Sequence, residues 1–320
     1  MVLFEENFLN IFLNSFILLM AIIFLWQGAS FLIESASNLA KKWGISELVI
    51  GLTVIALGTS APEFAVTINA ALNQKPDISV GNIVGSNIFN LGFILGFIAL
   101  IKPITTSKKL VYRDGLFMIG VTFLLLIFFS DYYLSFWEGA LLLGLLICYL
   151  IFLYLKKEPL DLVETNNIAL KRSSWKDYLI LIFSLAAVVL GGHYLVESAS
   201  FLAKTGGISD WVIGVTIVAA GTSAPELVTS LTAVLKGKPG MSAGNLIGSD
   251  LFNILGVLGL AGCLNPMQID SKAYPSLLML FFMVGLVIFF FRTNWQVSRK
   301  EGAILVMISI LRWVSIYFIK

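Results

Sequence analysis

The sequence predicts an all-α integral membrane protein with ten transmembrane helices, arranged as two inverted five-helix repeats with broken helices at the centre. Three observations support this fold class. Of the 320 residues, 58% are hydrophobic and only 12% are charged, apolar stretches long enough to cross a bilayer recur along the chain, and one half of the chain repeats in the other. A soluble globular protein of this size needs more charged residues to cover its surface. We therefore expect an integral membrane protein.

Apolar stretches separated by short polar breaks define the predicted spans. A span needs about 20 apolar residues to cross the hydrocarbon core. The predicted spans lie near residues 8–38, 44–73, 79–101, 114–130, 133–155, 177–203, 208–235, 241–264, 274–291 and 301–319. We therefore expect a first five-helix repeat over residues 1–155, a short cytoplasmic linker over 156–176 and a second, inverted repeat over 177–320. The linker is too short to bury a core of its own, so no catalytic domain is expected and the protein is not predicted to be an enzyme.

The positions of the basic residues predict the orientation in the membrane. With the N-terminus outside, ten spans place most lysines and arginines on the cytoplasmic side; the exceptions are Lys75, Lys204, Lys272, Arg312 and Lys320. Short cytoplasmic loops carry such an excess of basic residues. We therefore expect a multi-pass protein of the cell membrane with both termini external. The net charge of only +2 does not indicate a nucleic-acid partner. The expected surroundings, and the expected partner, are the lipid bilayer.

An internal repeat relates the two halves. Residues 34–96 align with residues 197–259 without a gap, and Gly-Thr-Ser-Ala-Pro-Glu occurs at 58–63 and again at 221–226. The segment Gly-Ser-x-x-Phe-Asn occurs at 85–90 and 248–253. Packing alone explains repeated Gly and Ala, but not matched Glu, Ser, Thr and Asn inside apolar spans. Because each half holds five spans, the second copy enters the membrane from the opposite side, which is a recurrent plan of secondary transporters.

The Gly-Thr-Ser-Ala-Pro-Glu segment concentrates oxygen ligands around a proline. Thr59 and Ser60 precede Glu63 by four and three residues, which would place all three on one helical face. Pro62 removes a helix hydrogen bond and frees the carbonyl of Gly58. Freed carbonyl groups in lipid are costly unless something binds them. A hard cation is a suitable partner for these oxygens.

The repeated segments together predict an oxygen-only cation site. Ser86 with Asn90, and Ser249 with Asn253, are each four residues apart on one helical face. Calcium takes six to eight oxygen ligands, whereas zinc and copper prefer nitrogen or sulfur. No Lys or Arg lies in the central parts of the spans to neutralise the glutamates, and an ionisable residue at membrane depth is by default a functional candidate. Ca²⁺ and Na⁺ are therefore the expected partners, as transported ions, and no prosthetic group is expected.

These paired segments resemble the two alpha-repeats of the sodium/calcium exchanger family, within the calcium/cation antiporter superfamily, in a short microbial-type form without a regulatory loop. The resemblance implies a calcium site formed by Glu63, Glu226, Thr59 and Thr222. It implies sodium sites that use Ser60, Ser86, Asn90, Ser223, Ser249, Asn253, Ala56 and Ala219, together with Glu63 and Glu226. It also implies that spans one and six slide across the remaining bundle to expose the site alternately. The implied function is exchange of Na⁺ for Ca²⁺, with no obligatory protein partner.

Two kinds of alternative stay open at this point. Proton-coupled or potassium-dependent calcium antiport is one kind; proton-coupled relatives typically carry a different segment at 58–63, and potassium-dependent relatives carry Asp at the position of Asn253. A cation channel, which would use the same oxygens without a counter-ion gradient, is the other. Asp250, whose repeat partner is Asn87, is an accessory candidate: its place one residue after Ser249 turns it off the face that carries Ser249 and Asn253, so it would edge the site or a water-filled path, or serve packing.

Overall fold

The computed structural model describes residues 2–156, 175–208, 213, 217 and 219–318. Most of the predicted linker at 156–176 and the start of the predicted span at 208–235 lie outside the described residues. In the first half the elements are α1 (Val2–Trp43), α2 (Glu47–Ile50), η1 (Gly51–Ile55), α3 (Ala56–Thr59), α4 (Ala61–Leu72), α5 (Pro76–Phe89), η2 (Asn90–Ile94), α6 (Leu95–Ile101), β1 (Ile104–Thr105), η3 (Leu110–Gly115), α7 (Leu116–Phe128), η4 (Phe129–Asp131), β2 (Tyr133–Leu134) and α8 (Phe136–Leu155).

The second half repeats this order. Its elements are α10 (Trp175–Thr205), α12 (Ala219–Gly221), α13 (Ala224–Leu235), α14 (Pro239–Leu251), η6 (Phe252–Leu258), α15 (Gly259–Leu264), β3 (Met267–Gln268), η7 (Ser271–Ala273), α16 (Tyr274–Arg292), β4 (Gln296–Val297) and α17 (Arg299–Phe318). Among the described residues, seven helices are long and apolar enough to cross a membrane, or eight if the bent pair α2–α4 is one span. The all-α membrane class is confirmed, and the count of ten spans stays a prediction.

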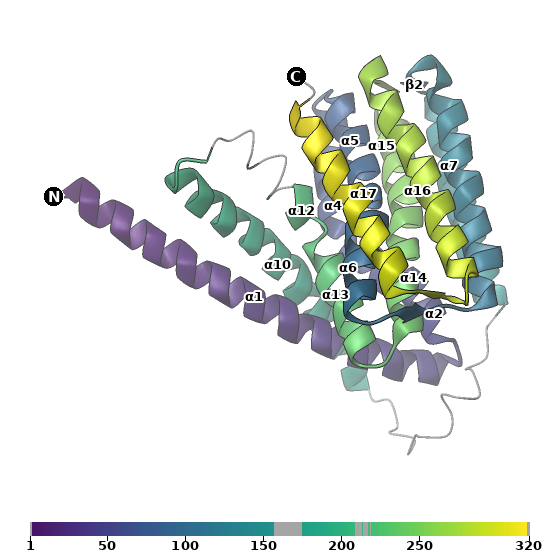
Figure 1. Cartoon of the computed structure of the whole chain (residues 1–320), viewed down its shortest axis with the longest axis horizontal. Helices are drawn as coiled ribbons and strands as arrows, with labels where there is room; N and C mark the ends of the chain where they lie inside the picture. The colour runs from purple at the N-terminus through teal and green to yellow at the C-terminus, as the bar shows by residue number, and fades with distance from the viewer. Residues whose placement is uncertain (1, 157–174, 209–212, 214–216, 218, 319–320) are drawn as a thin grey trace.

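The long helices form two groups. Helices α1 and α10 lie side by side and run obliquely away from an upright bundle that contains the other long helices (Figure 1). Small residues allow the two helices to approach closely: a Cβ on Gly28 would lie 3.0 Å from Val188, and a Cβ on Gly191 would lie 3.0 Å from Leu25. Small residues at helix crossings are typical of membrane proteins, where close packing replaces the hydrophobic drive.

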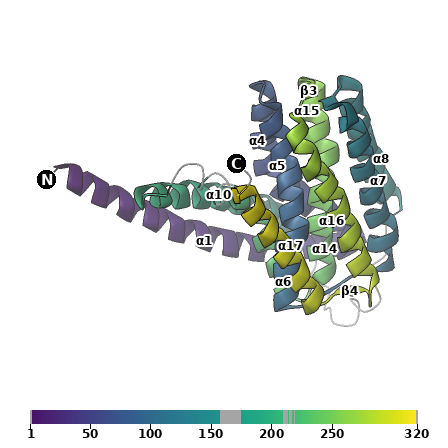
Figure 2. The ribbon, with the colours of Figure 1, turned by 45° about the horizontal axis from the view of Figure 1, so that its top comes forward.

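Two short antiparallel strand pairs connect the repeats at opposite ends of the upright bundle (Figure 2). Strand β1 pairs with β4, with Ile104 opposite Val297. Strand β2 pairs with β3, with Leu134 opposite Met267. Each pair takes one strand from each half of the chain, so the halves are joined to one another and do not form separate domains.

A polar cluster holds the C-terminal part of α1 against the upright bundle. The Ser37 hydroxyl donates to Glu47 Oε1 over 2.7 Å, and the Lys238 ammonium contacts both Ser37 and Glu47. Next to it, Lys236 Nζ donates to the carbonyl of Ser30 over 2.7 Å. These contacts join α1 to the start of α2 and to the α13–α14 connection at one end of the molecule.

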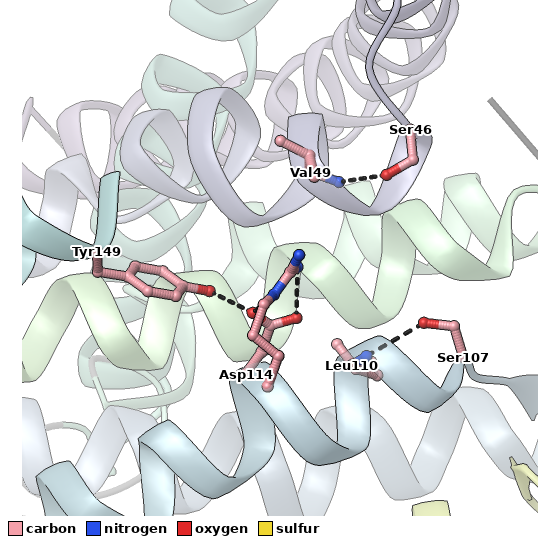
Figure 3. A network of polar contacts seen from close by, with 7 residues as sticks. Ser46, Val49, Ser107, Leu110, Asp114 and Tyr149 are labelled. Atoms are coloured by element: carbon pink, nitrogen blue, oxygen red, sulfur yellow. Dashed lines mark hydrogen bonds and ion pairs between the residues drawn. The ribbon is translucent and has the colours of Figure 1, made fainter. Parts of the chain in front are cut away.

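A second polar network near the same helices contains a buried acid that the sequence did not single out. Asp114, in η3, is fully buried and accepts hydrogen bonds from Arg113 over 2.7 and 2.9 Å and from the Tyr149 hydroxyl of α8 over 2.8 Å. Figure 3 shows Tyr149 pointing at Asp114, with the Ser46–Val49 and Ser107–Leu110 caps nearby. The hydrogen bond from Tyr149 connects η3 to α8. Because the adjacent Arg113 guanidinium balances the charge of Asp114, this carboxylate is not a free cation ligand.

Backbone atoms of α14 and the α2–η1–α3 segment approach one another closely. A Cβ on Gly244 would lie 2.5 Å from the carbonyl oxygen of Leu48, and a Cβ on Gly248 would lie 2.5 Å from that of Leu52. On the facing helix, a Cβ on Gly51 would lie 2.5 Å from the carbonyl oxygen of Met241. Glycines on both helices therefore allow this short separation. The same two helices carry the polar residues of the repeated segments.

Substituting one of these glycines tests the close approach. We expect Gly248→Ala to lower the free energy of unfolding by about 1–3 kcal/mol, because the added methyl group meets backbone atoms that cannot rotate away. Gly285→Ala in α16 is the control, since no heavy atom lies within 4 Å of its added Cβ, and alanine favours a helix over glycine. Thermal unfolding in detergent measures both. Equal stability of the two variants would contradict the proposed role of Gly248.

Candidate functional site

The helix that carries the first Gly-Thr-Ser-Ala-Pro-Glu segment is broken at Ser60. The segments Glu47–Thr59 and Ala61–Leu72 meet at an angle of 50°, and Pro62 lies in the first turn of α4. Proline is tolerated there because the N–H it lacks would have no helix partner. In the second repeat α13 begins directly after Ser223 with Pro225 in its first turn. The predicted broken helix is therefore present, and each break sets a glutamate at a helix N-terminus.

The break changes one detail of the prediction. Thr59, Ser60 and Glu63 do not share one face of a continuous helix, because the axis turns between Ser60 and Ala61. The Thr59 hydroxyl instead lies 3.3 Å from the Ser249 hydroxyl and 3.3 Å from Asn245 Oδ1, both on α14. Residues adjacent in the motif thus face the other repeat and not each other.

The two glutamates are held by hydrogen bonds that cross between the repeats. Ser223 donates to Glu63 Oε1 over 3.0 Å, and Ser60 donates to Glu226 Oε1 over 3.3 Å. Both carboxyl groups are fully buried, and the second oxygen of each has no hydrogen-bond partner. Each lies in the first turn of its helix, where the helix dipole favours negative charge. The arrangement is two equivalent buried acids, each with one oxygen fixed and one oxygen unpaired.

The α5 and α14 helices bring four further side chains together. Asn90 Nδ2 donates to Asp250 Oδ1 over 3.0 Å, and the repeat-equivalent Asn253 Nδ2 donates to Asn87 Oδ1 over 3.0 Å. All four residues are fully buried. Both helices change to wider π-helical turns here, at Asn90–Ile94 and at Phe252–Leu258, and such turns are frequent at functional sites. Asp250 therefore lies inside the polar cluster, in contact with Asn90, although its position one residue after Ser249 predicted that it would be turned off that face.

The remaining predicted residues occupy a range of positions around this centre. Ser249 Oγ also lies 3.5 Å from the carbonyl oxygen of Ala56, and Ser86 is buried on α5. Thr222 follows α12, which begins at Ala219, and its hydroxyl has no hydrogen-bond partner. Thus Ala56, Thr59 and Ser249 are brought into mutual contact, and Thr222 directly precedes Ser223, the hydroxyl of which donates to Glu63.

Two supporting asparagines were missed by the sequence reasoning. Asn245 donates to the hydroxyls of Thr229 and Ser230 over 3.0 and 2.9 Å. Its repeat partner, Asn82, donates to Thr67 over 2.9 Å and to the carbonyl of Glu63 over 3.3 Å. The signal was present, because both asparagines follow a glycine and lie four residues before a candidate serine.

The oxygen atoms of this centre determine which cations it suits. Among the described residues there is no group of three or more His, Cys, Asp and Glu placed to hold a metal ion together. The unpaired atoms are carboxylate, amide and hydroxyl oxygens, which suit hard cations such as Ca²⁺ and Na⁺. The centre therefore offers oxygen ligands from both repeats to a hard cation.

Comparison with known proteins gives the family. The family model described as "Sodium/calcium exchanger protein" matches residues 13–155 and 176–316. The chain belongs to the sodium/calcium exchanger family. It is 35% identical to "Sodium/calcium exchanger MaX1" of Methanosarcina acetivorans, with 96% of this chain and 99% of that protein covered. It is 36% identical to "Putative antiporter CaxA" of Alkalimonas amylolytica, with 91% and 94% covered.

A solved exchanger structure agrees with the fold. The sodium-calcium exchanger NCX_Mj, soaked without Na⁺ and Ca²⁺, superposes with a TM-score of 0.85 and 31% sequence identity, over 96% of this chain and 99% of that chain. The exchanger family consists of transporters, so the comparisons place this chain among membrane transport proteins and not in a class of enzymes.

Calcium binding to the purified exchanger tests the two glutamates. We expect Ca²⁺ to raise the unfolding temperature, since a ligand at about 100 times its Kd stabilises the folded state by about 2.7 kcal/mol. Glu63→Gln or Glu226→Gln should remove most of this shift because each deletes a carboxylate ligand. Glu197→Gln is the matched control, because that side chain is 65% exposed on α10. A normal calcium shift in Glu63→Gln would exclude Glu63 as a ligand.

Proposed function

We propose that the protein is a secondary antiporter that exchanges Na⁺ for Ca²⁺ by alternating access. The observation that carries the proposal is the crossed pair of serine–glutamate hydrogen bonds, which places two buried carboxylates in equivalent settings at the interface of the two repeats. Two carboxylates balance the charge of one Ca²⁺. The names of relatives with this architecture, which include sodium/calcium exchangers, support the same ion pair.

The charge and coordination number of each ion decide which ligands we assign to it. Calcium takes the two carboxylates and oxygens of the adjacent threonines, because a divalent ion needs the most charge and the highest coordination number. Sodium uses smaller groups of oxygens around the same centre, including the carboxylates in turn. The calcium residues are Glu63, Glu226, Thr59 and Thr222; the sodium residues are Ser60, Ser86, Asn90, Ser223, Ser249, Asn253, Ala56, Ala219, Glu63 and Glu226.

Alternating access would come from α1 and α10 moving against the upright bundle. The Ser37–Glu47–Lys238 cluster fixes α1 to that bundle at one end. The acid at the equivalent position of the second repeat lies outside the described residues, so only the Lys238 end is described. Opening toward that end requires the polar cluster to separate.

Repeat boundaries and orientation complete the proposal. We place the first repeat at 1–155, the linker at 156–176 and the inverted repeat at 177–320, and the matched ranges 13–155 and 176–316 support this division. We place the protein in the cell membrane with both termini external. Lys102, Lys236, Arg292 and Arg299 cap carbonyls or an aromatic residue around the β1–β4 end of the bundle, which supports that end as cytoplasmic. The proposed exchange involves the two ions and the lipid bilayer and invokes no obligatory protein partner.

Ion flux in proteoliposomes tests the function. We expect calcium uptake when sodium-loaded vesicles are diluted into sodium-free buffer, with no uptake when sodium is absent from both sides. Glu63→Gln should lose most of this uptake and Glu197→Gln should keep it. If three Na⁺ exchange for one Ca²⁺, the cycle moves one charge, worth about 2.3 kcal/mol per 100 mV, so uptake should respond to membrane potential.

Three outcomes of the flux experiment would replace the proposal. Calcium uptake without a sodium gradient would indicate a channel. Uptake driven by a proton gradient with sodium absent would indicate proton-coupled exchange. An absolute requirement for potassium would indicate a potassium-dependent exchanger. The measurement therefore needs separate sodium, proton and potassium arms in vesicles whose voltage is clamped.

Sided labelling tests the inverted repeat. Single cysteines replacing Lys75 and Lys236, in a background with Cys148 and Cys263 changed to serine, should react with a membrane-impermeant maleimide from opposite sides. Both positions are exposed and follow repeat-equivalent helices, α4 and α13. Labelling of both from the same side would refute the inversion.

A further inference from the structure

We propose that Asp250 forms a further cation position, adjacent to the Glu63–Glu226 pair, that binds sodium. The inference rests on the proposed exchange of Na⁺ for Ca²⁺ and deepens it, because it assigns a third carboxylate to the ion pathway. Asp250 lies in the last turn of α14 and is fully buried.

The carboxyl group of Asp250 meets no basic side chain among the described residues. Ion pairs such as Arg113 with Asp114, Lys236 with Glu34 and Lys238 with Glu47 involve other acids. Asp250 Oδ1 accepts one hydrogen bond, from Asn90, and Oδ2 has no hydrogen-bond partner. A buried carboxylate with one oxygen unpaired is costly unless a cation or a donor meets it.

The repeat symmetry isolates what is special about this position. The Asn90–Asp250 and Asn253–Asn87 hydrogen bonds are equivalent, each 3.0 Å long. Asn87 then uses its Nδ2 to donate to the backbone carbonyl of Asp250 over 3.1 Å. Asp250 carries an oxygen where Asn87 carries that NH₂ group, so the reciprocal bond cannot form. The substitution converts a hydrogen-bonded contact into an acceptor without a donor.

Neighbouring oxygens supply further ligands of the right kind. Asn90 Oδ1 and Asn253 Oδ1 are also buried without hydrogen-bond partners. Their Nδ2 groups are already engaged, which fixes both side chains. One carboxylate and neutral amide oxygens suit a monovalent hard cation better than a divalent one, which needs more negative charge. Sodium is the monovalent cation that the proposed cycle supplies.

A sodium titration of calcium-loaded protein tests this position. The purified full-length exchanger is loaded with ⁴⁵Ca²⁺ at fixed pH without potassium, and the NaCl concentration that displaces half of the calcium is measured. We expect Asp250→Asn to raise this concentration about tenfold or more, the scale for loss of a charged ligand. Calcium affinity without sodium should change by less than about threefold. KCl and choline chloride arms distinguish sodium from general ionic strength.

A charge swap provides the matched variant. Asp250→Asn combined with Asn87→Asp moves the acid to the repeat-equivalent position and should restore sodium displacement to within about threefold of the wild type. An unchanged sodium midpoint in folded Asp250→Asn, an equal loss of calcium and sodium affinity, or a potassium response that shifts in place of the sodium response would each overturn the assignment.

A second variant keeps the inference testable should Asp250→Asn fail to fold. Asp250→Ser removes the carboxyl group but keeps a hydroxyl group at the same position, so it should raise the NaCl concentration for half displacement in the same direction. An unchanged sodium midpoint in folded Asp250→Ser would reject the sodium position at Asp250 and leave sodium-driven calcium uptake, and with it the proposed function, untouched.

Discussion

Burial of two carboxyl groups at the centre of a membrane protein is the constraint on which the rest of the structure depends. Glu63 and Glu226 are fully buried, and in the described part of the chain neither meets a basic side chain. Charge in a low-dielectric interior is costly unless it is compensated. The protein compensates partly through helix N-termini and crossed serine hydroxyls, and leaves one oxygen of each carboxyl free. We propose that a transported cation completes the compensation.

Close helix packing makes this arrangement geometrically possible. Glycines at 51, 244 and 248 bring backbone atoms of the two repeats into contact, so that Thr59 and Ser249 can meet at 3.3 Å. The asparagines at 82 and 245 then hold the helices on either side by hydrogen bonds to neighbouring hydroxyls. The oxygens are thereby positioned by the backbone and by a surrounding polar network, which is how a site keeps its geometry in the absence of ions.

Two equally buried aspartates have different surroundings in this protein. Asp114 is as buried as Asp250, but Arg113 and Tyr149 satisfy it, and it joins η3 to α8. Asp250 is met by an amide alone and retains an unpaired oxygen. The surroundings of a buried acid, and not its burial, therefore distinguish the structural role of Asp114 from the cation-binding role that we propose for Asp250. Repeat symmetry sharpens the comparison, because Asn87 shows what the same position does without a charge.

The sequence by itself determined the membrane class, the duplication and the oxygen-only chemistry. Hydropathy follows directly from composition, and matched Glu, Ser and Asn at a constant offset are visible without coordinates. Only the tertiary structure decided which residues meet. The helix break at Ser60 turns the side chains of one motif toward the other repeat, so Ser60 serves Glu226 and Ser223 serves Glu63. Asp250 likewise enters the polar cluster because α14 packs beside α5, a contact between residues far apart in sequence that helical periodicity along one segment cannot reveal.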